Sequence, residues 1–228
     1  LNQSGCSLHM LSTNKGMLTR KFNCMSRIID LEMIENGMIA SCHDGNVFFF
    51  EDREFNPVMS IKAKEGPKIT VHPNLKLCMV CTQNKIFAYD LRNLRRPIKS
   101  KIQQNSPPLI SAHMGLRGRF LALVRPDFID FCEPFSLEIS CTYPYQAGGP
   151  LFSLTPDEDA FLVQGRSGAL RIISTPPQTE LIAVLPGHEK MAVCSDFSSS
   201  YFNFVSVGCE CLYWVNDQKA IRSMQAAH

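Results

Sequence analysis

The chain has 228 residues, 23 of them basic and 21 acidic, so its formal net charge is only +2. This balance excludes the strongly basic tail or face that non-specific nucleic-acid binding needs. Because the sequence has no apolar run of about 18 residues, the length that a membrane-spanning helix requires, we expect no membrane insertion.

Short apolar segments follow one another along the chain, and turn residues bound each of them. This pattern is typical of β-strands. Asn-Gly and Asp-Gly, as at Asp44-Gly45, favour tight hairpins between such strands. The one weak helical candidate is 217–228, which could equally be a final strand, so we predict an all-β chain. The main expected strands are 27–34, 38–42, 46–50, 77–81, 85–89, 120–124, 128–131, 161–163, 170–173, 204–207 and 211–215.

Ten cysteines are scattered along the chain, many of them inside apolar runs such as Leu77-Cys78-Met79-Val80-Cys81. Reduced cysteines occur in this way in proteins of the cytoplasm or nucleus, where we place the chain. Cys78 and Cys81 have the spacing of zinc ligands, but on a strand they would point to opposite faces, so we predict no metal site.

A repeat of about 41 residues organises the chain. Equivalent apolar strand ends fall at positions 11, 50, 89, 131, 173 and 215. A four-stranded unit of this length is the blade of a β-propeller. We therefore predict a single propeller domain over residues 1–228. It would hold a partial blade at 1–23 and five complete blades at about 24–64, 65–106, 107–147, 148–188 and 189–228.

Several short motifs resemble the WD-repeat propeller family. Tyr89-Asp90 matches the dipeptide that ends the family's third strand, Asp44-Gly45 stands at the usual second hairpin, and Gly187-His188 precedes Val215-Asn216 at the family's spacing. The resemblance implies structural roles for Asp44, Tyr89, Asp90 and His188. The other Gly-His and Trp-Asp sites are degenerate, so we expect the family's buried hydrogen-bond tetrad to be mostly absent.

A seven-bladed ring at this period needs roughly 290 residues. Either the remaining blades lie outside this chain, or a partner completes an open ring. Two more specific resemblances cover shorter stretches of the chain. Residues 89–98, 131–134 and 149–151 resemble the propeller of the large subunit of the poly(A)-nuclease deadenylase, whereas 108–113 and 212–215 resemble a small WD-repeat nucleoporin.

No catalytic motif is found in the sequence, so we expect no enzyme activity and no cofactor. Gly165-Arg166-Ser167-Gly168 reads as a hairpin turn, and Asp157, Glu158 and Asp159 as solvated acids of a turn. His72 precedes Pro73-Asn74 and is expected to stabilise a turn. Trp214 is expected to pack in the core.

These features predict a non-catalytic scaffold that binds other subunits or peptides in an intracellular complex. The alternatives are an accessory propeller of an RNA-processing assembly, which contacts RNA or its bound proteins, and a structural nucleoporin-like subunit. Top-face connections are candidate binding loops. They are 23–26, 64–67, 105–107, 146–149 and 187–190, with the hairpins at Asp44, Asn84, Asp127 and Ser167.

The strongest charge cluster follows Tyr89-Asp90. Because few acids lie between 92 and 119, we expect its charge to be uncompensated locally and to form one basic patch with the arginines of a neighbouring turn. An acidic segment or RNA is the expected ligand, since guanidinium groups pair with carboxylates and phosphates. A charged edge strand that stays soluble is the alternative. The candidate residues are Arg92, Arg95, Arg96, Lys99, Lys101, Arg117 and Arg119.

Overall fold

The computed structural model describes residues 6–11, 18–24, 26–35, 37–51, 59–63, 66–103, 106–165, 168–186, 188–198 and 203–215. Every regular element in these ranges is a β-strand, as the sequence predicts, and the expected strands are found within one or two residues of their positions. The segment 217–228 lies outside the described residues.

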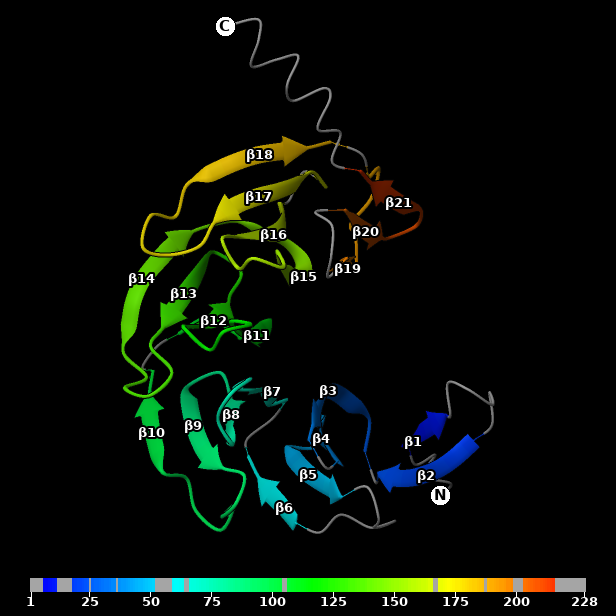
Figure 1. Cartoon of the computed structure of the whole chain (residues 1–228), viewed down its shortest axis with the longest axis vertical. Coiled ribbons are helices and arrows are strands. Elements are labelled where there is room, and N and C mark those ends of the chain that lie inside the picture. Colours follow the sequence, from blue (N-terminus) through cyan, green and yellow to red (C-terminus); the bar gives the residue numbers. More distant parts are fainter. Residues whose placement is uncertain are drawn as a thin grey trace, which may run out of the picture. The chain divides into compact units, whose positions relative to one another are not determined.

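Strands that are consecutive in the chain pair antiparallel in a series of small sheets (Figure 1). The first sheet is a pair, β1 (Cys6–Leu11) and β2 (Leu18–Cys24). Sheet I contains β3 (Ile28–Ile34), β4 (Gly37–Cys42), β5 (Asn46–Glu51) and β6 (Met59–Lys62). Sheet II contains β7 (Lys68–Val71), β8 (Leu77–Cys81), β9 (Lys85–Asp90) and β10 (Lys99–Ile102).

The same meander continues in the second half of the chain. Sheet III contains β11 (Ser111–Met114), β12 (Leu121–Val124), β13 (Phe128–Cys132) and β14 (Ile139–Pro144). Sheet IV contains β15 (Ala147–Leu154), β16 (Ala160–Gly165), β17 (Leu170–Ser174) and β18 (Leu181–Leu185). Sheet V has three strands in the described part of the chain, β19 (Cys194–Phe197), β20 (Phe204–Val207) and β21 (Cys211–Trp214).

Backbone contacts divide the chain into two compact units. Unit 1 comprises Leu1–Leu121 with Cys132–Glu138, and unit 2 comprises Ala122–Phe131 with Ile139–His228, so the division passes through sheet III. We describe each unit by itself. The single domain and the blade boundaries stay predictions.

Burial follows a gradient across each sheet. The second strands β4, β8, β12 and β16 are buried at every residue, whereas the outer strands β10, β14 and β18 are mostly exposed. A strand without an exposed face must be covered on both sides of its sheet. In unit 1 such a core lies between sheets I and II, where Ile39, Val47 and Phe49 of sheet I pack against Val80 and Tyr89 of sheet II.

In sheets I, II and III, backbone hydrogen bonds join the end of the outer strand to the preceding hairpin. The amide of Ala63 donates to the carbonyl of Gly45 at 2.8 Å, and that of Gln103 donates to Asn84 at 2.7 Å. In unit 2 the amide of Tyr145 donates to Asp127 at 2.9 Å. Each of these three sheets therefore has the same kind of hydrogen bond, or tie. It connects the outer strand to the tip of the hairpin that joins the second and third strands.

Candidate functional site

The predicted basic residues begin in the turn after β9. Asp90 accepts hydrogen bonds from the Arg92 guanidinium, with Nη2 2.6 Å from Oδ2 and Nε 2.9 Å from Oδ1. The arginine lowers the pKa of the Asp90 carboxyl to about 2. Arg92 therefore closes this turn, while Arg95 and Arg96 stay exposed beyond it. Tyr89 is buried in the core between sheets I and II.

The lysines of β10 face carboxylates that come from much later in the sequence. Lys101 forms an ion pair with Glu138 that lowers the pKa of this carboxyl, and the charge of Lys99 adds to the effect. Hydrogen bonds from Ser136 and Phe135 lower the pKa of Glu133, with a smaller contribution from Lys99. The expectation that this charge cluster is uncompensated is wrong for Arg92 and Lys101, whose carboxylate partners Asp90 and Glu138 lie outside the 92–119 window.

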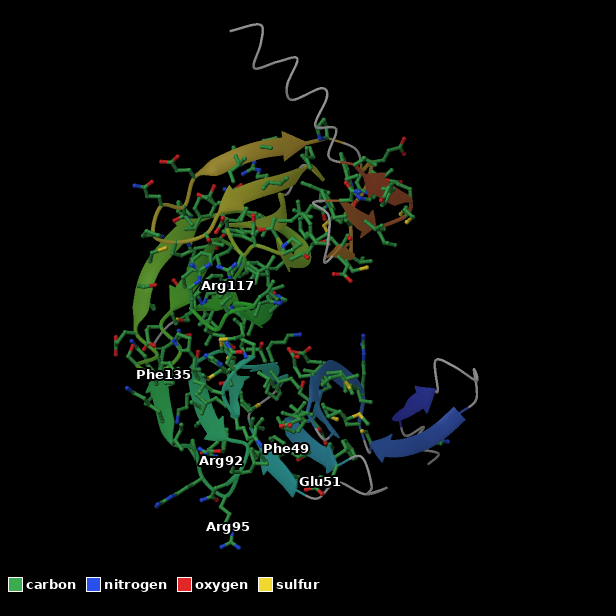
Figure 2. All side chains as sticks on the ribbon, in the orientation of Figure 1. Phe49, Glu51, Arg92, Arg95, Arg117 and Phe135 are labelled. Atoms are coloured by element: carbon green, nitrogen blue, oxygen red, sulfur yellow. The ribbon has the colours of Figure 1, made fainter. Side chains whose placement is uncertain are left out.

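Arg117 and Arg119 are exposed on the turn between β11 and β12. Figure 2 shows Arg92 and Arg95 beside sheet II, in the turn after β9, whereas Arg117 lies apart from them on the turn between β11 and β12. The structure therefore places Arg92 and Arg95 in one turn and keeps Arg117 separate from both.

His72 connects three turns of unit 1. They are the β7–β8 turn, in which it lies, the β11–β12 turn, which carries Arg117 and Arg119, and the turn after β13. His72 Nδ1 accepts the amides of Asn74 at 3.2 Å and Leu75 at 3.1 Å, as expected for a histidine that stabilises a turn. Since Nδ1 accepts, Nε2 carries the hydrogen and bonds the carbonyl of Gly118. The ring centroid of Phe135, on the turn after β13, lies 6.0 Å from that of His72.

Gly118 permits this close contact. Its φ is +70°, which favours glycine, and a Cβ built there would lie 2.1 Å from His72 Nε2. The tied turns expose large apolar side chains, Leu116 at 52% and Phe135 at 55%. We define the His72 turn surface by Leu75, Leu116, Arg117, Arg119 and Phe135, all in unit 1.

We expect His72 to make unit 1 sensitive to acid. Burial lowers the pKa of His72, and protonation would remove the acceptor of two backbone amides. The stabilising contribution is complete above the unfolded pKa, about 6.5, and is lost as the pH falls through the lower folded pKa. Urea unfolding at pH 7.5 and 5.5 should show a larger loss for the wild type than for His72→Asn, which offers an acceptor that does not titrate. An equal loss in both proteins would contradict this role.

A four-residue network lies in sheet V of unit 2. His188 Nε2 is 2.7 Å from Ser206 Oγ, which also accepts the Trp214 indole N–H at 2.8 Å. His188 Nδ1 lies 2.9 Å from Glu210 Oε1, and since a carboxylate only accepts, Nδ1 carries the hydrogen. Trp214 also stacks on Phe204, with 5.6 Å between ring centroids.

A histidine, a serine, a tryptophan and a carboxylate are thus linked in sheet V, so the expected absence of such a tetrad does not extend to this sheet, while for the other sheets it stays a prediction. The tryptophan that donates is Trp214, one residue before the Val215 chosen from the motif spacing. Ser206 and Glu210 were not identified from the sequence. A serine on the second strand and a carboxylate in the following turn were nevertheless visible there as candidates for such a network. Gly187 lies outside the described residues.

The serine, histidine and glutamate have the connectivity of a nucleophilic relay. Such a relay needs a serine whose oxygen reaches the substrate carbonyl. Ser206 is 0% exposed, and its oxygen already accepts the Trp214 hydrogen bond. The arrangement is therefore suited to holding the strands of sheet V together.

A buried arginine was also missed by sequence reasoning. Arg125, at the hairpin between β12 and β13, is 0% exposed, and its Nε lies 3.6 Å from Asp130 Oδ2. Thr142 donates to the other oxygen of Asp130 at 2.7 Å, and the guanidinium carbon lies 6.0 Å from the centroid of Phe128. These groups link the strands of one hairpin to β14.

Two carboxylates on the first strand of sheet I form a further polar contact. Asp30 Oδ2 accepts the amide of Ile69 at 2.9 Å, which ties β3 to β7. Burial, together with the charge of Asp30, raises the pKa of Glu32 to about 7. Alternation along β3 places Asp30 and Glu32 on one face, a signal that the sequence already contains.

The remaining candidates are structural where they are described. Asp157 accepts the Thr155 hydroxyl at 2.6 Å and the Asp159 amide at 3.1 Å, but Glu158 is fully buried at a φ of +65°, so the expectation of three solvated acids is wrong for Glu158. Arg166 and Ser167 lie outside the described residues. Among those described, no group of three or more His, Cys, Asp or Glu side chains could hold a metal ion.

The candidate loops are only partly described. The described hairpins are those at Asp44, where the carboxylate accepts the Asn46 amide at 3.1 Å, and at Asn84 and Asp127. Each of the five connecting loops except 146–149 contains residues outside the described ranges. In the described ranges there is no helix long and apolar enough to cross a membrane.

Comparison with known proteins identifies the fold. No family model and no curated protein matches the sequence. Among solved structures, 1381 chains match. One belongs to the "Crystal Structure of Mitotic Checkpoint Complex", with a TM-score of 0.79 and 12% sequence identity over 92% of this chain and 68% of that chain. The identity is low, so this likeness shows the fold alone: the chain is an all-β β-propeller.

Proposed function

We propose that this chain is a non-catalytic WD-repeat scaffold that binds protein segments within a larger complex of the cytoplasm or nucleus. The WD-repeat assignment is supported by the network of His188, Ser206, Trp214 and Glu210, which corresponds to the tetrad of that family. The nine cysteines whose pairing is described form no disulfide, as in proteins of a reducing compartment.

The main support for the scaffold role is the exposed His72 turn surface. Leu116 and Phe135 expose large apolar side chains on turns that hydrogen bonds and ring contacts hold in place. Exposed apolar groups surrounded by polar ones mark protein interaction sites. Arg117 and Arg119 lie on the same turn as Leu116, so an acidic segment with apolar side chains is the partner that fits best.

RNA contact is the second candidate. It rests on the exposed cations Arg95, Arg96, Arg117 and Arg119. A protein partner is favoured because Asp90 and Glu138 already bind Arg92 and Lys101, which leaves fewer cations for phosphates, and because phosphate contacts dominate RNA affinity.

Matched variants test the scaffold role. Arg117→Ser with Phe135→Ser should abolish capture of partner proteins after crosslinking in cells, because both the apolar anchor and the charge are lost. Arg95→Ser with Ile98→Ser makes the same kinds of change elsewhere on unit 1 and should retain the partners. Equal capture by both double variants would contradict the proposal. If RNA is the ligand, four phosphate contacts should weaken binding by about 50-fold between 50 and 200 mM salt.

A further inference from the structure

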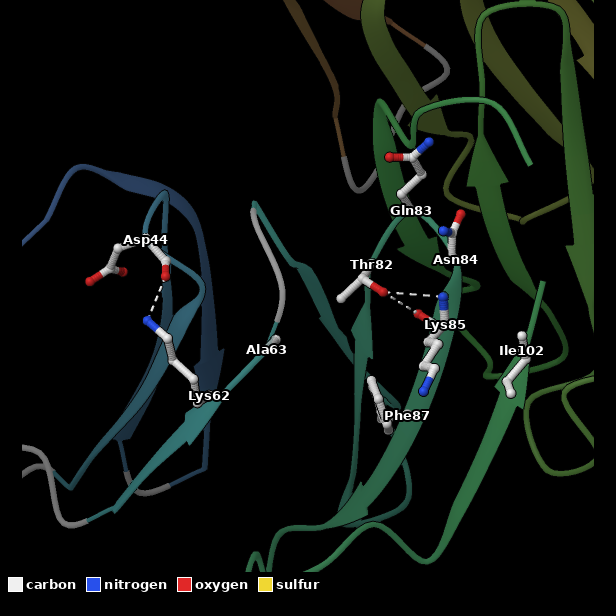
Figure 3. A pocket seen from close by; sticks show the side chains of 9 residues that line it. All are labelled: Asp44, Lys62, Ala63, Thr82, Gln83, Asn84, Lys85, Phe87 and Ile102. Carbon is white, nitrogen blue, oxygen red and sulfur yellow. Dashed lines mark hydrogen bonds between the residues drawn. The ribbon is translucent and has the colours of Figure 1, made fainter. Parts of the chain in front are cut away.

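A groove of about 980 Å³ opens between sheets I and II, next to two hairpin tips (Figure 3). Lys62 and Ala63 line it from the end of β6, and Asp44 from the hairpin after β4. The opposite wall comes from the β8–β9 hairpin and the strands that follow it, with Asn84, Lys85, Phe87 and Ile102 among its residues. All of these residues belong to unit 1.

Side-chain size explains why the groove is open. On β9, Lys85, Phe87 and Tyr89 alternate onto the same face of sheet II. Tyr89 is buried in the core against sheet I, Phe87 is only partly buried, and Lys85 is exposed. Ile102 pairs with Lys85 across the strands and is 59% exposed. Ala63, on the facing wall, is too short to cover Phe87 and Ile102.

Charged and amide groups border this apolar wall. Lys62 Nζ donates to the Asp44 carbonyl at 2.6 Å, and the Asp44 carboxylate accepts the Asn46 side chain at 2.6 Å. Lys85 points along the wall beside Phe87, and the Asn84 amide stands at the rim (Figure 3). The Lys85 ammonium makes no hydrogen bond or ion pair to the residues that the structure describes.

We propose that this groove binds an extended peptide segment that carries an apolar side chain next to an acidic one. The apolar side chain would cover Phe87 and Ile102, which removes their apolar surface from water. The carboxylate would pair with Lys85, and the peptide backbone would bond the Asn84 amide. This site shares no residue with the His72 turn surface, so the two proposals are tested separately.

The test uses random eight-residue peptides displayed on phage and selected against the whole chain, followed by fluorescence anisotropy with the enriched peptides. We expect enrichment of an apolar residue next to Asp or Glu. Ile102→Ser and Lys85→Ser should each weaken binding about tenfold or more, because each removes one of the two recognition elements.

Two control variants lie outside the groove. Ile98→Ser changes an isoleucine that is 60% exposed, almost the same as Ile102, and Lys76→Ser removes an exposed lysine of the β7–β8 turn, which pairs with Glu35 and not with the groove. Neither should change the affinity. The proposal is overturned if no acidic peptide is enriched, if the controls weaken binding as much as the groove variants, or if a short RNA oligonucleotide binds at Lys85 more tightly than the peptides.

Discussion

Arg125→Met is expected to lower the free energy of unfolding by about 3–5 kcal/mol, one of the two largest effects that we predict. The methionine fills much of the space of the arginine but leaves the Asp130 carboxylate buried without its cation. Asp130 is only 7% exposed at its side chain, so water cannot replace the guanidinium. Urea unfolding monitored by circular dichroism measures the loss.

A second variant separates the unpaired charge from the loss of packing. Arg125→Met combined with Asp130→Asn removes the charge and keeps a hydrogen-bond acceptor for Thr142. At least half of the lost stability should return. If the double variant is as unstable as Arg125→Met alone, packing and not charge is the reason for the loss.

Phe161→Ala is expected to cost about 3–5 kcal/mol, since it leaves a cavity where the surroundings cannot collapse. The Phe161 side chain is fully buried in unit 2. Its ring centroid lies 5.3 Å from that of Phe152 and 5.5 Å from that of Phe131, and Tyr143 meets its edge at 6.3 Å. The urea midpoint should fall accordingly.

The matched control is Phe135→Ala, the same substitution at a phenylalanine that is more than half exposed. Its cost should stay below about 1 kcal/mol, because little apolar surface is buried there. A loss for Phe161→Ala no larger than that of the control would contradict the packing that we describe.

The sequence predicts the strands well because the second strands of sheets I to IV are buried on both faces and are therefore mostly apolar runs, such as Leu77–Cys81. Turn residues then mark where each run ends. The repeat is visible because the third strands of sheets I to IV end at regular intervals, at residues 51, 90, 132 and 174. These properties are local or periodic, so they can be found without coordinates.

The polar contacts could not be predicted in the same way, because they join residues far apart in the chain. Glu138 pairs with Lys101 across 37 positions, and nothing near either residue indicates the other. Arg125 precedes Pro126 and Asp127, a pattern typical of an exposed turn, and its burial arises only from packing. The His72 turn surface was missed for the same reason, although Arg117 and Arg119 on it were predicted.

The hydrogen bonds between outer strands and hairpin tips determine how freely the amino-acid sequence of the tips can vary. The φ of +88° at Gly45 favours glycine there. At Asn84 and Asp127, by contrast, the hydrogen bond uses main-chain atoms only, so it does not depend on which side chain occupies the tip. Substitutions at these tips can therefore alter recognition while the path of the backbone persists. Evolution can diversify these positions independently in successive repeats, and a protein engineer can graft new recognition residues onto them with little risk to the fold.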